Sequence, residues 1–256
     1  MAPGDSHQGT PEPCPAVEDR RSFSVRIVDR HGLWQGTESG LPSFDGRVTW
    51  QTTAWADAEQ YVQPDLSITV ARDLAHLSDN GLPRAAVSVL VDTNVPIGLR
   101  HCGPIVACQR GELQDVISTL AQAVFRVALA DQVVSYDWVE IEEFLRPDCL
   151  LVVRSLPAAS AEAFAAAAIN AACHFQGSSR IEPDGLLLGI AAPSVIPLVQ
   201  RRNFTRPLQT LAGYHCHFLA GVHTHRGLPP EAALLLSFPI PRMPGEHVRP
   251  GRARRR

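Results

Sequence analysis

The chain has 256 residues, 45% of them hydrophobic, so it is long enough to bury one core or two small ones. Its net charge of −3 and pI near 6.4 give no overall positive charge for binding nucleic acid. All 23 basic residues are Arg, which excludes a Schiff-base lysine and a Walker-type phosphate-binding lysine. No apolar run approaches membrane-spanning length, and the six Cys lack CxxC pairs, as is typical of reduced cytoplasmic thiols.

The two ends of the chain differ in composition from its middle. Residues 1–22 are rich in Pro, Gly and charge, which predicts a disordered arm. Residues 241–256 predict a second disordered segment, and its terminal Arg cluster is suited to contact acidic surfaces. A tail of this length contributes only non-specific attraction to phosphates, so we expect no specific nucleic-acid partner.

The region from 23 to 114 begins with patterns of strands. Segments 22–29 and 46–55 are rich in β-branched and aromatic residues between turn formers, which predicts two strands. Segment 65–81 contains a predicted amphipathic helix that ends at Asn80-Gly81. Segment 84–94 is a nearly continuous apolar run, as in a buried parallel strand.

The remainder of the chain alternates between helices and strands. A long apolar helix is predicted over 115–130, followed by a short helix over 139–145. The further predicted elements are a strand at 149–156, an Ala-rich helix at 159–175, a strand at 185–192, a short helix or turn at 193–202, a helix at 206–213, and strands at 214–225 and 231–240 joined by a turn. This order indicates a layer of helices packed on one sheet.

Two carboxylates flank an aromatic residue at the start of the short helix. In the segment 133–145, Asp137 occupies an N-cap position and Glu140 follows three residues later. This spacing is that of a capping box, which stabilises a helix start and needs no further function. The alternative is that the acidic loop has a function of its own.

The long helix, acidic loop and second helix resemble the junction between the two domains of the FtsZ/tubulin family. There a central helix ends in a loop of the form N-x-D-F-x-D, whose acids reach the nucleotide of the next subunit. Here Ser135 stands for the Asn, Asp137 and Glu140 for the acids, and Trp138 for the Phe. The order of elements over 84–240, including DGLLLGI and FLAGV, is also similar to that family.

The resemblance implies an α/β fold in three parts. These would be a shortened Rossmann-like part at 23–114, a central helix at 115–130, and an FtsZ-like C-terminal α+β two-layer sandwich at 131–240. By this resemblance, Asp137 and Glu140 would be the catalytic acids of the loop, acting only across an interface.

The nucleotide loops of that family are degenerate in this chain. Its motif G-G-G-T-G-[ST]-G is matched only by Gly36, Thr37, Ser39 and Gly40, and Glu38 replaces the middle glycine. A phosphate cradle needs closely approaching backbone N–H groups, and a carboxylate at its centre would repel a triphosphate. Composition alone favours a surface loop. We therefore expect weak GTP binding or none, and no other cofactor.

Four histidines form a second constellation. If 214–225 is one strand, His215, His217, His223 and His225 share one face, and the intervening side chains face the core. Histidines two positions apart lie about 6.5–7 Å apart along a strand, so each pair has the spacing to chelate zinc or copper. The alternative is a solvated strand face that carries His without binding metal.

The sequence therefore favours a divergent FtsZ/tubulin-like cytoskeletal or cell-division-associated protein of the cytoplasm. We expect a degenerate GTPase at most, acting through its acidic loop on an FtsZ-like protein or on a second copy of itself. A metal-binding protein or metalloenzyme built on the paired histidines is one alternative. A non-catalytic interaction scaffold is the other.

Overall fold

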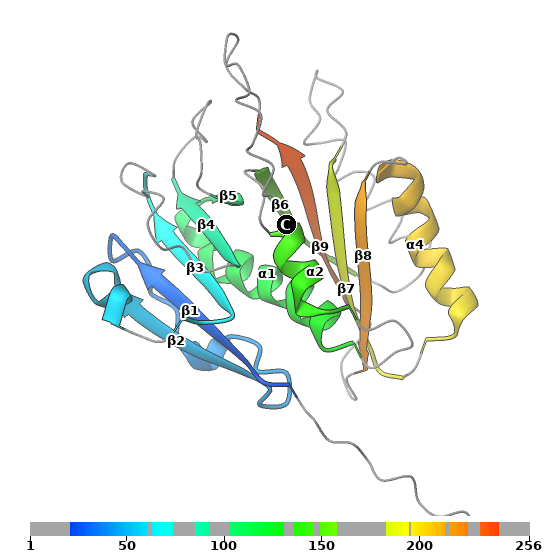
Figure 1. The fold of residues 1–256 in the computed structure, drawn as a ribbon, viewed down its shortest axis with the longest axis horizontal. Helices are drawn as coiled ribbons and strands as arrows, with labels where there is room; N and C mark the ends of the chain where they lie inside the picture. The colour runs from blue at the N-terminus through cyan, green and yellow to red at the C-terminus, as the bar shows by residue number, and fades with distance from the viewer. Residues whose placement is uncertain are drawn as a thin grey trace, which may run out of the picture.

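The chain folds around one mixed sheet. The computed structural model describes residues 21–60, 63–73, 85–92, 103–130, 136–145, 149–157, 183–194, 196–212, 216–224 and 231–240. Within these ranges nine strands form a single sheet in the order β2-β1-β3-β4-β5-β6-β9-β7-β8, with helices against it (Figure 1). The predicted α/β class is confirmed.

The N-terminal half of the sheet is entirely parallel. Its strands are β1 (Phe23–Asp29), β2 (Val48–Ala54), β3 (Leu66–Ala71), β4 (Ala86–Val91) and β5 (Ile105–Cys108). Three short 3-10 helices lie in the connections. η1 (Glu38–Gly40) lies between β1 and β2, η2 (Trp55–Gln60) follows β2, and η3 (Arg110–Glu112) follows β5. The chain adds β2 on one side of β1 and β3 to β5 on the other, so the strand order reverses at β1.

The C-terminal half of the sheet is mixed. Its strands are β6 (Cys149–Pro157), β7 (Gly185–Ala192), β8 (His217–Thr224) and β9 (Glu231–Pro239). β9 runs antiparallel between β6 and β7, and β8 lies parallel beside β7. The four strands predicted for this half therefore share one sheet, as expected. The pairing of Ile105 with Leu150 joins β5 to β6 and makes the two halves continuous.

Helices cover both faces of the C-terminal strands. These helices are α1 (Leu113–Ala128), α2 (Trp138–Phe144) and α4 (Leu198–Ala212). Figure 1 shows these strands nearly edge-on, with α1 and α2 on one side and α4 on the other. Successive residues of a strand alternate between the two faces. Accordingly, Leu187 of β7 belongs to the core under α1, and Leu188 belongs to the core under α4.

Two neighbouring glycines let α1 lie directly on the sheet. Gly189 of β7 pairs with Gly221 of β8. A Cβ atom at Gly189 would lie 2.7 Å from the carbonyl oxygen of Ala123. A Cβ atom at Gly221 would lie 2.6 Å from Cα of Val127. Because real Cβ atoms do not approach backbone this closely, only glycine fits at either position beneath the helix.

The outer side of α1 is covered by aromatic rings. Phe125 is fully buried and its ring stacks with Trp138 of α2 at 6.0 Å between centroids. Phe23 of β1 and Phe44 of the loop before β2 pack on the same ring at 5.5 and 5.8 Å. The helix is thereby enclosed between the sheet and residues from both halves of the chain, which explains its almost complete burial from Ala123 to Val127.

A buried ion pair fixes α1 to the start of β9. Arg126 is 4% exposed, and its Nη2 lies 3.5 Å from Oε2 of Glu231. Burial lowers the pKa of the Arg126 guanidinium from its usual value, and the Glu231 carboxylate opposes that shift. The other carboxylate oxygen of Glu231 accepts a hydrogen bond from the hydroxyl of Ser155 on β6 at 3.1 Å. The pair therefore ties the helix to two strands.

Two sequence predictions are wrong in detail, and strand β3 was not predicted. β3 occupies the start of segment 65–81, where Leu66, Ile68 and Val70 are buried along the strand, and the end of the helix expected in that segment lies outside the described residues. The helix or turn at 193–202 and the helix at 206–213 are one helix, α4, which tolerates Pro207 inside it. The strands at 214–225 and 231–240, expected to pair as a hairpin across a turn, are not neighbours in the sheet, because β7 lies between β8 and β9. Strand β5 was not predicted at all.

Several other predictions fall outside the described residues. These are most of the arm 1–22, the tail 241–256, the C-terminal part of segment 65–81 and the Ala-rich helix 159–175. The domain boundaries at 114 and 130 also stay predictions. The central helix itself is confirmed, since α1 spans Leu113–Ala128 where 115–130 was expected.

The contact between α1 and the sheet is testable by adding one methyl group. We expect Gly221→Ala to lower the free energy of unfolding by about 1–3 kcal/mol, because the new Cβ overlaps the backbone of α1. The measurement is urea denaturation. Gly111→Ala is the control, since nothing lies within 4 Å of its Cβ, and it should change stability by less than about 0.5 kcal/mol. Equal stabilities for both variants would contradict the close packing.

The buried ion pair makes a second prediction. Glu231→Ala removes the partner of Arg126 and leaves a buried charge without its carboxylate, so we expect a loss of about 1–3 kcal/mol in thermal or urea unfolding. This loss is smaller than that expected for a fully buried ion pair, because the Glu231 side chain is 34% exposed and its charge is partly screened by water. Glu143→Ala, on an exposed position of α2, is the matched control and should be nearly neutral. Unchanged stability of Glu231→Ala would show that the pair is not needed.

Candidate functional site

The candidate site lies at the carboxyl ends of the parallel strands. In the order β2-β1-β3-β4-β5 the connections change direction between β1 and β3. Ligands of open α/β sheets bind outside the carboxyl ends of strands at such a reversal. In this chain the residues that directly follow β1 and β3 are polar: Arg30 and His31 after β1, Arg72 and Asp73 after β3.

Asp29, the last residue of β1, organises the turn that follows. Its Oδ1 accepts hydrogen bonds from the backbone N–H groups of His31 at 3.1 Å and Leu33 at 3.0 Å. Its Oδ2 accepts a third from the N–H of Trp34 at 2.9 Å. Gly32 within this turn has φ of +64°, a conformation that glycine adopts without strain. Three converging N–H groups form the kind of nest that binds anions, and here the anion is the chain's own carboxylate.

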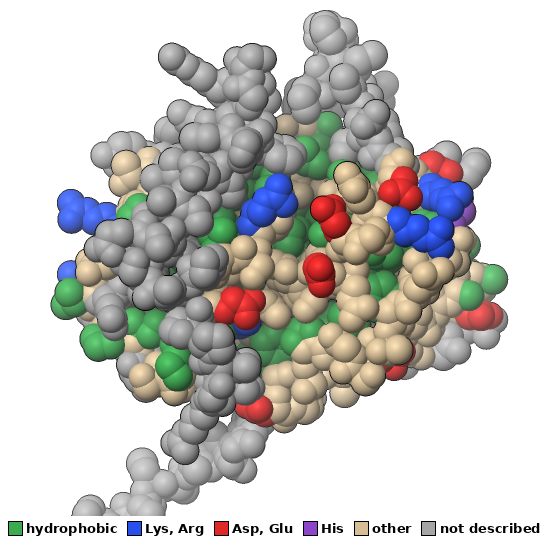
Figure 2. Space-filling view, turned by 180° about the vertical axis from the view of Figure 1, so that it is seen from behind, with side chains coloured by type: hydrophobic (Ala, Val, Ile, Leu, Met, Phe, Trp, Pro, Cys, Tyr) green, Lys and Arg blue, Asp and Glu red, His purple; other side chains and the backbone are tan. Residues whose placement is uncertain are grey.

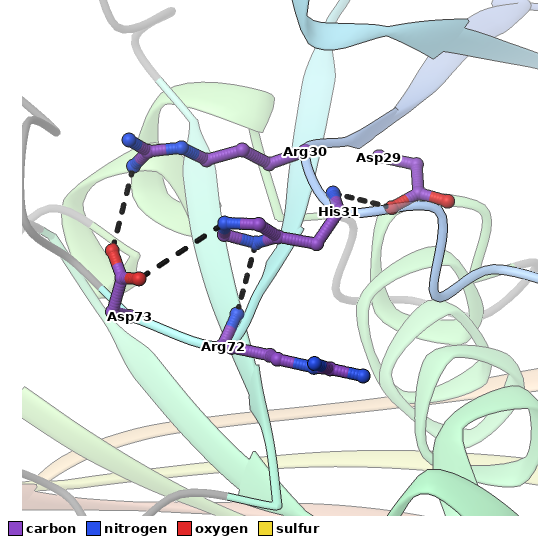
Figure 3. Close-up of polar contacts among 5 residues, drawn as sticks. All are labelled: Asp29, Arg30, His31, Arg72 and Asp73. Carbon is purple, nitrogen blue, oxygen red and sulfur yellow. Dashed lines mark hydrogen bonds and ion pairs between the residues drawn. The ribbon is translucent and has the colours of Figure 1, made fainter.

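A polar network joins the two strand ends next to this turn (Figure 3). The Nδ1 atom of His31 accepts a hydrogen bond from the backbone N–H of Arg72 at 3.2 Å. Asp73 lies 4.0 Å from Nε2 of His31 and 3.9 Å from the guanidinium of Arg30. These contacts fix the carboxyl ends of β1 and β3 relative to each other. Because each charge in the cluster has an opposite charge or a donor nearby, the cluster carries no strong excess of either sign.

A pocket of about 560 Å³ opens on the other side of the turn, between the ends of β1 and β2. Arg30 and Trp55 both line it, with the guanidinium carbon of Arg30 5.3 Å from the centre of the Trp55 ring. The walls are completed by Asp29, Gly32, Thr52, Thr53 and Ala54. This volume is within the range of small-molecule sites in proteins.

The loop predicted as a vestigial phosphate site is filled by its own side chains. The indole of Trp34 packs on Gly36, where a Cβ would lie 2.5 Å from the ring. The amide of Gln114 packs on Gly40 in the same way, at 2.6 Å. The carboxylate of Glu38 accepts a hydrogen bond from the backbone N–H of Thr52 at 2.7 Å and so caps the edge strand β2.

The two hydroxyls of the same loop bond to each other. Ser39 donates to Oγ1 of Thr37 at 3.1 Å. Neither Gly36 nor Gly40 has a positive φ, so the backbone does not form the alternating conformation of an anion nest. The geometry of Gly36, Thr37, Ser39 and Gly40 is that of a packed surface loop. Their predicted role in GTP binding stays a prediction.

Asp137 and Glu140 form a capping box, as one alternative from the sequence requires, and are also exposed, as the other requires. Asp137 and Glu140 form a capping box at the start of α2, in which Oε2 of Glu140 accepts a hydrogen bond from the N–H of Asp137 at 3.0 Å. Both residues are nevertheless exposed, and Asp137 lies 3.9 Å from Arg21. Between them, Trp138 is anchored on Phe125. The two carboxylates therefore lie in solvent at the start of α2; Ser135 lies outside the described residues.

The histidines of β8 do not form complete pairs within the described residues. His215 and His225 lie outside them, and His217 and His223 are six positions apart, or about 20 Å along a strand. His217 is exposed. His223 is 4% exposed, with Nδ1 3.4 Å from the carbonyl oxygen of Leu129 and its ring edge against Phe44.

The expectation that only the intervening side chains of β8 face the core is wrong. The histidine face is also a core face, because α1 covers it at Gly221. Among the described residues, no group of three or more potential ligands could hold a metal ion. The paired-histidine metal site stays a prediction.

Thiol chemistry receives no support from the described cysteines. Burial, followed by the nearby Glu112 and Asp92, raises the pKa of Cys108 to about 11. Burial and Asp184 raise the pKa of Cys216 to about 11. Both remain protonated at neutral pH, whereas nucleophilic catalysis needs a thiolate.

The face of the molecule in Figure 2 shows no concentration of positive charge, among the residues drawn in colour, of the kind that binds nucleic acid. Figure 2 shows acidic and basic side chains interspersed over the residues drawn in colour on that face. A nucleic-acid site is expected to gather positive charge in one patch or stripe. No helix within the described ranges is long and apolar enough to cross a membrane.

Sequence reasoning missed the residues at the strand ends. The signal was present in the segments V-R-I-V-D-R-H and I-T-V-A-R-D, where charged residues directly follow buried strands. It was overlooked because the second of these segments was interpreted as part of a helix. Once β1 and β3 are recognised as parallel neighbours, their ends must meet at one edge of the sheet.

Comparison with known proteins finds similarity in fold and none in sequence. No protein-family model and no curated protein matches the sequence. The empty FtsZ dimer of M. jannaschii is similar in structure, with a TM-score of 0.61 and 10% identity over 86% of this chain and 89% of that one. A mutant FtsZ of the same organism has a TM-score of 0.57 at 9% identity, over 86% and 92%. CetZ from Methanosaeta thermophila strain DSM 6194 has a TM-score of 0.51 at 10% identity, over 84% and 86%. The chain therefore has a divergent FtsZ/tubulin-like fold.

Proposed function

We propose that the chain acts on a cytoskeletal polymer, or on a partner of FtsZ/tubulin-like fold, and that it is not an autonomous GTPase. The observation that carries this proposal is the turn after β1. There three backbone N–H groups that are arranged to bind an anion are occupied by the carboxylate of Asp29. A phosphate would have to displace this carboxylate and would meet its negative charge at close range. The packed loop at Gly36–Gly40 supports the same proposal.

The acidic loop supplies the surface for the proposed action. By the family resemblance, acids in this position help to position the water that attacks the γ-phosphate of the nucleotide in a neighbouring subunit. Asp137 and Glu140 are exposed and are held by α2 at the far end of α1. A chain that offers such a loop but no nucleotide site of its own would bind the nucleotide-bearing end of a filament and offer nothing to the next subunit. Glu140 is longer by one methylene than the family's Asp, which disturbs a tight catalytic geometry. Capping is thus favoured over stimulated hydrolysis.

The first test concerns the nucleotide. In calorimetric titration of the purified chain, we expect no GTP binding with a micromolar dissociation constant, because Asp29 occupies the N–H groups of the turn after β1, and Trp34 and Gln114 pack on Gly36 and Gly40. A micromolar affinity for GTP would overturn this part of the proposal.

The second test concerns the polymer. The chain is mixed at stoichiometric ratio with FtsZ from the same organism, and filament length and GTP turnover are measured. We expect shorter filaments. The double variant Asp137→Asn with Glu140→Gln should lose the effect, because it removes both charges while Asn and Gln still cap the helix.

The matched control is Glu143→Gln, which removes a charge from an exposed position of the same helix outside the capping box. It should shorten filaments as the unmodified chain does. If the unmodified chain leaves both filament length and turnover unchanged, or if Glu143→Gln is as defective as the double variant, the acidic loop is not the site of action.

A further inference from the structure

Two valines stand out on the surface of the C-terminal half of the chain. Val139 of α2 is 57% exposed and Val199 of α4 is 71% exposed. The third large hydrophobic side chain that is exposed among the described residues, Trp55, has the guanidinium of Arg30 over its ring. An isolated exposed Val is common on protein surfaces. What distinguishes these two is that each lies among side chains of one charge, and that the two charges are opposite.

The outward face of α2 is acidic. Ile141 and Phe144 are buried, so the side of the helix that they occupy faces the core. Val139 and Glu143 are exposed on the opposite side, and since they are four residues apart they lie next to each other along the helix. Segment 136–145 contains four carboxylates and no basic residue. Val139 therefore lies on a negatively charged surface.

The outward face of α4 is basic. Leu208 belongs to the core beneath this helix, whereas Val199, Arg202 and Arg206 are exposed. Steps of three and four residues bring these exposed side chains onto one side of the helix, away from Leu208. α4 contains three Arg and no acidic residue. Within the described ranges neither Arg202 nor Arg206 is in an ion pair, so both guanidinium groups are available to a partner.

The two surfaces are opposite in charge and alike in layout. On each helix the exposed Val is followed about one turn later by a charged side chain, Glu143 on α2 and Arg202 on α4. A contact between the surfaces removes both valines from water, and the opposite charges fix its register. We propose that α4 of one copy of this chain docks on α2 of a second copy, with Val199 against Val139 and the arginines of α4 against the carboxylates of α2.

The positions of the two helices determine the kind of assembly. α2 and α4 lie on opposite sides of the C-terminal strands (Figure 1), so the α4 of a chain does not reach the α2 of the same chain. The two copies present different surfaces to each other, which makes the contact heterologous. One copy keeps a free α2 and the other a free α4, so further copies add in the same way. Because both surfaces are small, the association is weak and transient.

The proposal is tested by sedimentation equilibrium of the full chain alone, at concentrations up to about 1 mM. We expect the average mass to rise above the 27.8 kDa of the monomer with concentration, and added salt to reduce this rise. The α4 variant, Arg202→Glu with Arg206→Glu, should remain a monomer. The α2 variant, Val139→Arg with Glu143→Arg, should also remain a monomer. All four positions are exposed, so both variants are expected to fold, and urea denaturation verifies this.

A mixture of the two variants gives the sharpest readout. The α4 variant retains an intact α2, and the α2 variant retains an intact α4. An equimolar mixture should therefore form a 1:1 dimer and nothing larger, although neither variant associates alone. The matched control is Arg110→Glu with Arg154→Glu, which changes the net charge as the α4 variant does, at exposed positions on other elements. The control should associate as the unmodified chain does.

The outcomes that overturn the proposal are distinct. A constant monomer mass of the unmodified chain over the whole range would exclude the contact. Self-association that the α2 variant retains would show that α4 binds a different acidic surface, and a mixture that stays monomeric would exclude a heterologous contact. Binding to vesicles of anionic phospholipid that the α4 variant loses, without self-association of the unmodified chain, would assign α4 to a lipid surface instead. None of these measurements involves FtsZ, so their failure is separable from that of the proposed function.

Discussion

The fold depends on the close contact between α1 and the sheet. Gly189 and Gly221, side by side on β7 and β8, carry no side chain between the strand backbone and the helix. This approach places Arg126 beside Glu231 and places Phe125 where rings from β1, α2 and the loop before β2 can enclose it. A helix held away from the sheet by even one methyl group would shift all of these contacts together, because interiors are packed without spare volume.

The same contact determines where function can reside. Trp138 at the start of α2 stacks on Phe125 of α1, and the carboxylates of Asp137 and Glu140 beside it lie in solvent. At the opposite end of β1 lies the reversal of strand order beside which ligands bind in α/β folds. There the backbone N–H groups of the turn after β1 donate to the carboxylate of Asp29. The chain thus has an FtsZ/tubulin-like fold in which the backbone N–H groups of the turn after β1 donate to the chain's own Asp29.

The sequence predicted most elements because their patterns are local. The strands at Gly185–Ala192 and Glu231–Pro239 and the helix at Leu113–Ala128 are long and strongly apolar, and their pattern alone identified them. Strand β3 was missed because Leu66–Ala71 is continuous with a helical pattern, and only parallel pairing with β1 and β4 makes it a strand. The hairpin was wrong for the same reason: which strands pair is a tertiary property. The candidate site was missed because Asp29, Arg30 and Asp73 meet only after β1 and β3 align.

The loop before β2 shows how the two halves are held in one structure. Phe44 and Asp45 have φ of +52° and +58°, followed by Gly46 at +77°. Non-glycine residues in this region cost about 1–2 kcal/mol each, so the loop is strained unless packing offsets it. The Phe44 ring supplies that packing, because it is buried between Phe125 of α1 and His223 of β8. The strained backbone is thus stabilised by contacts with the C-terminal half of the chain. Because the N–H of Val48 donates to the carbonyl of Ser43, the same loop also sets where β2 begins, so residues far apart in sequence determine the position of this edge strand.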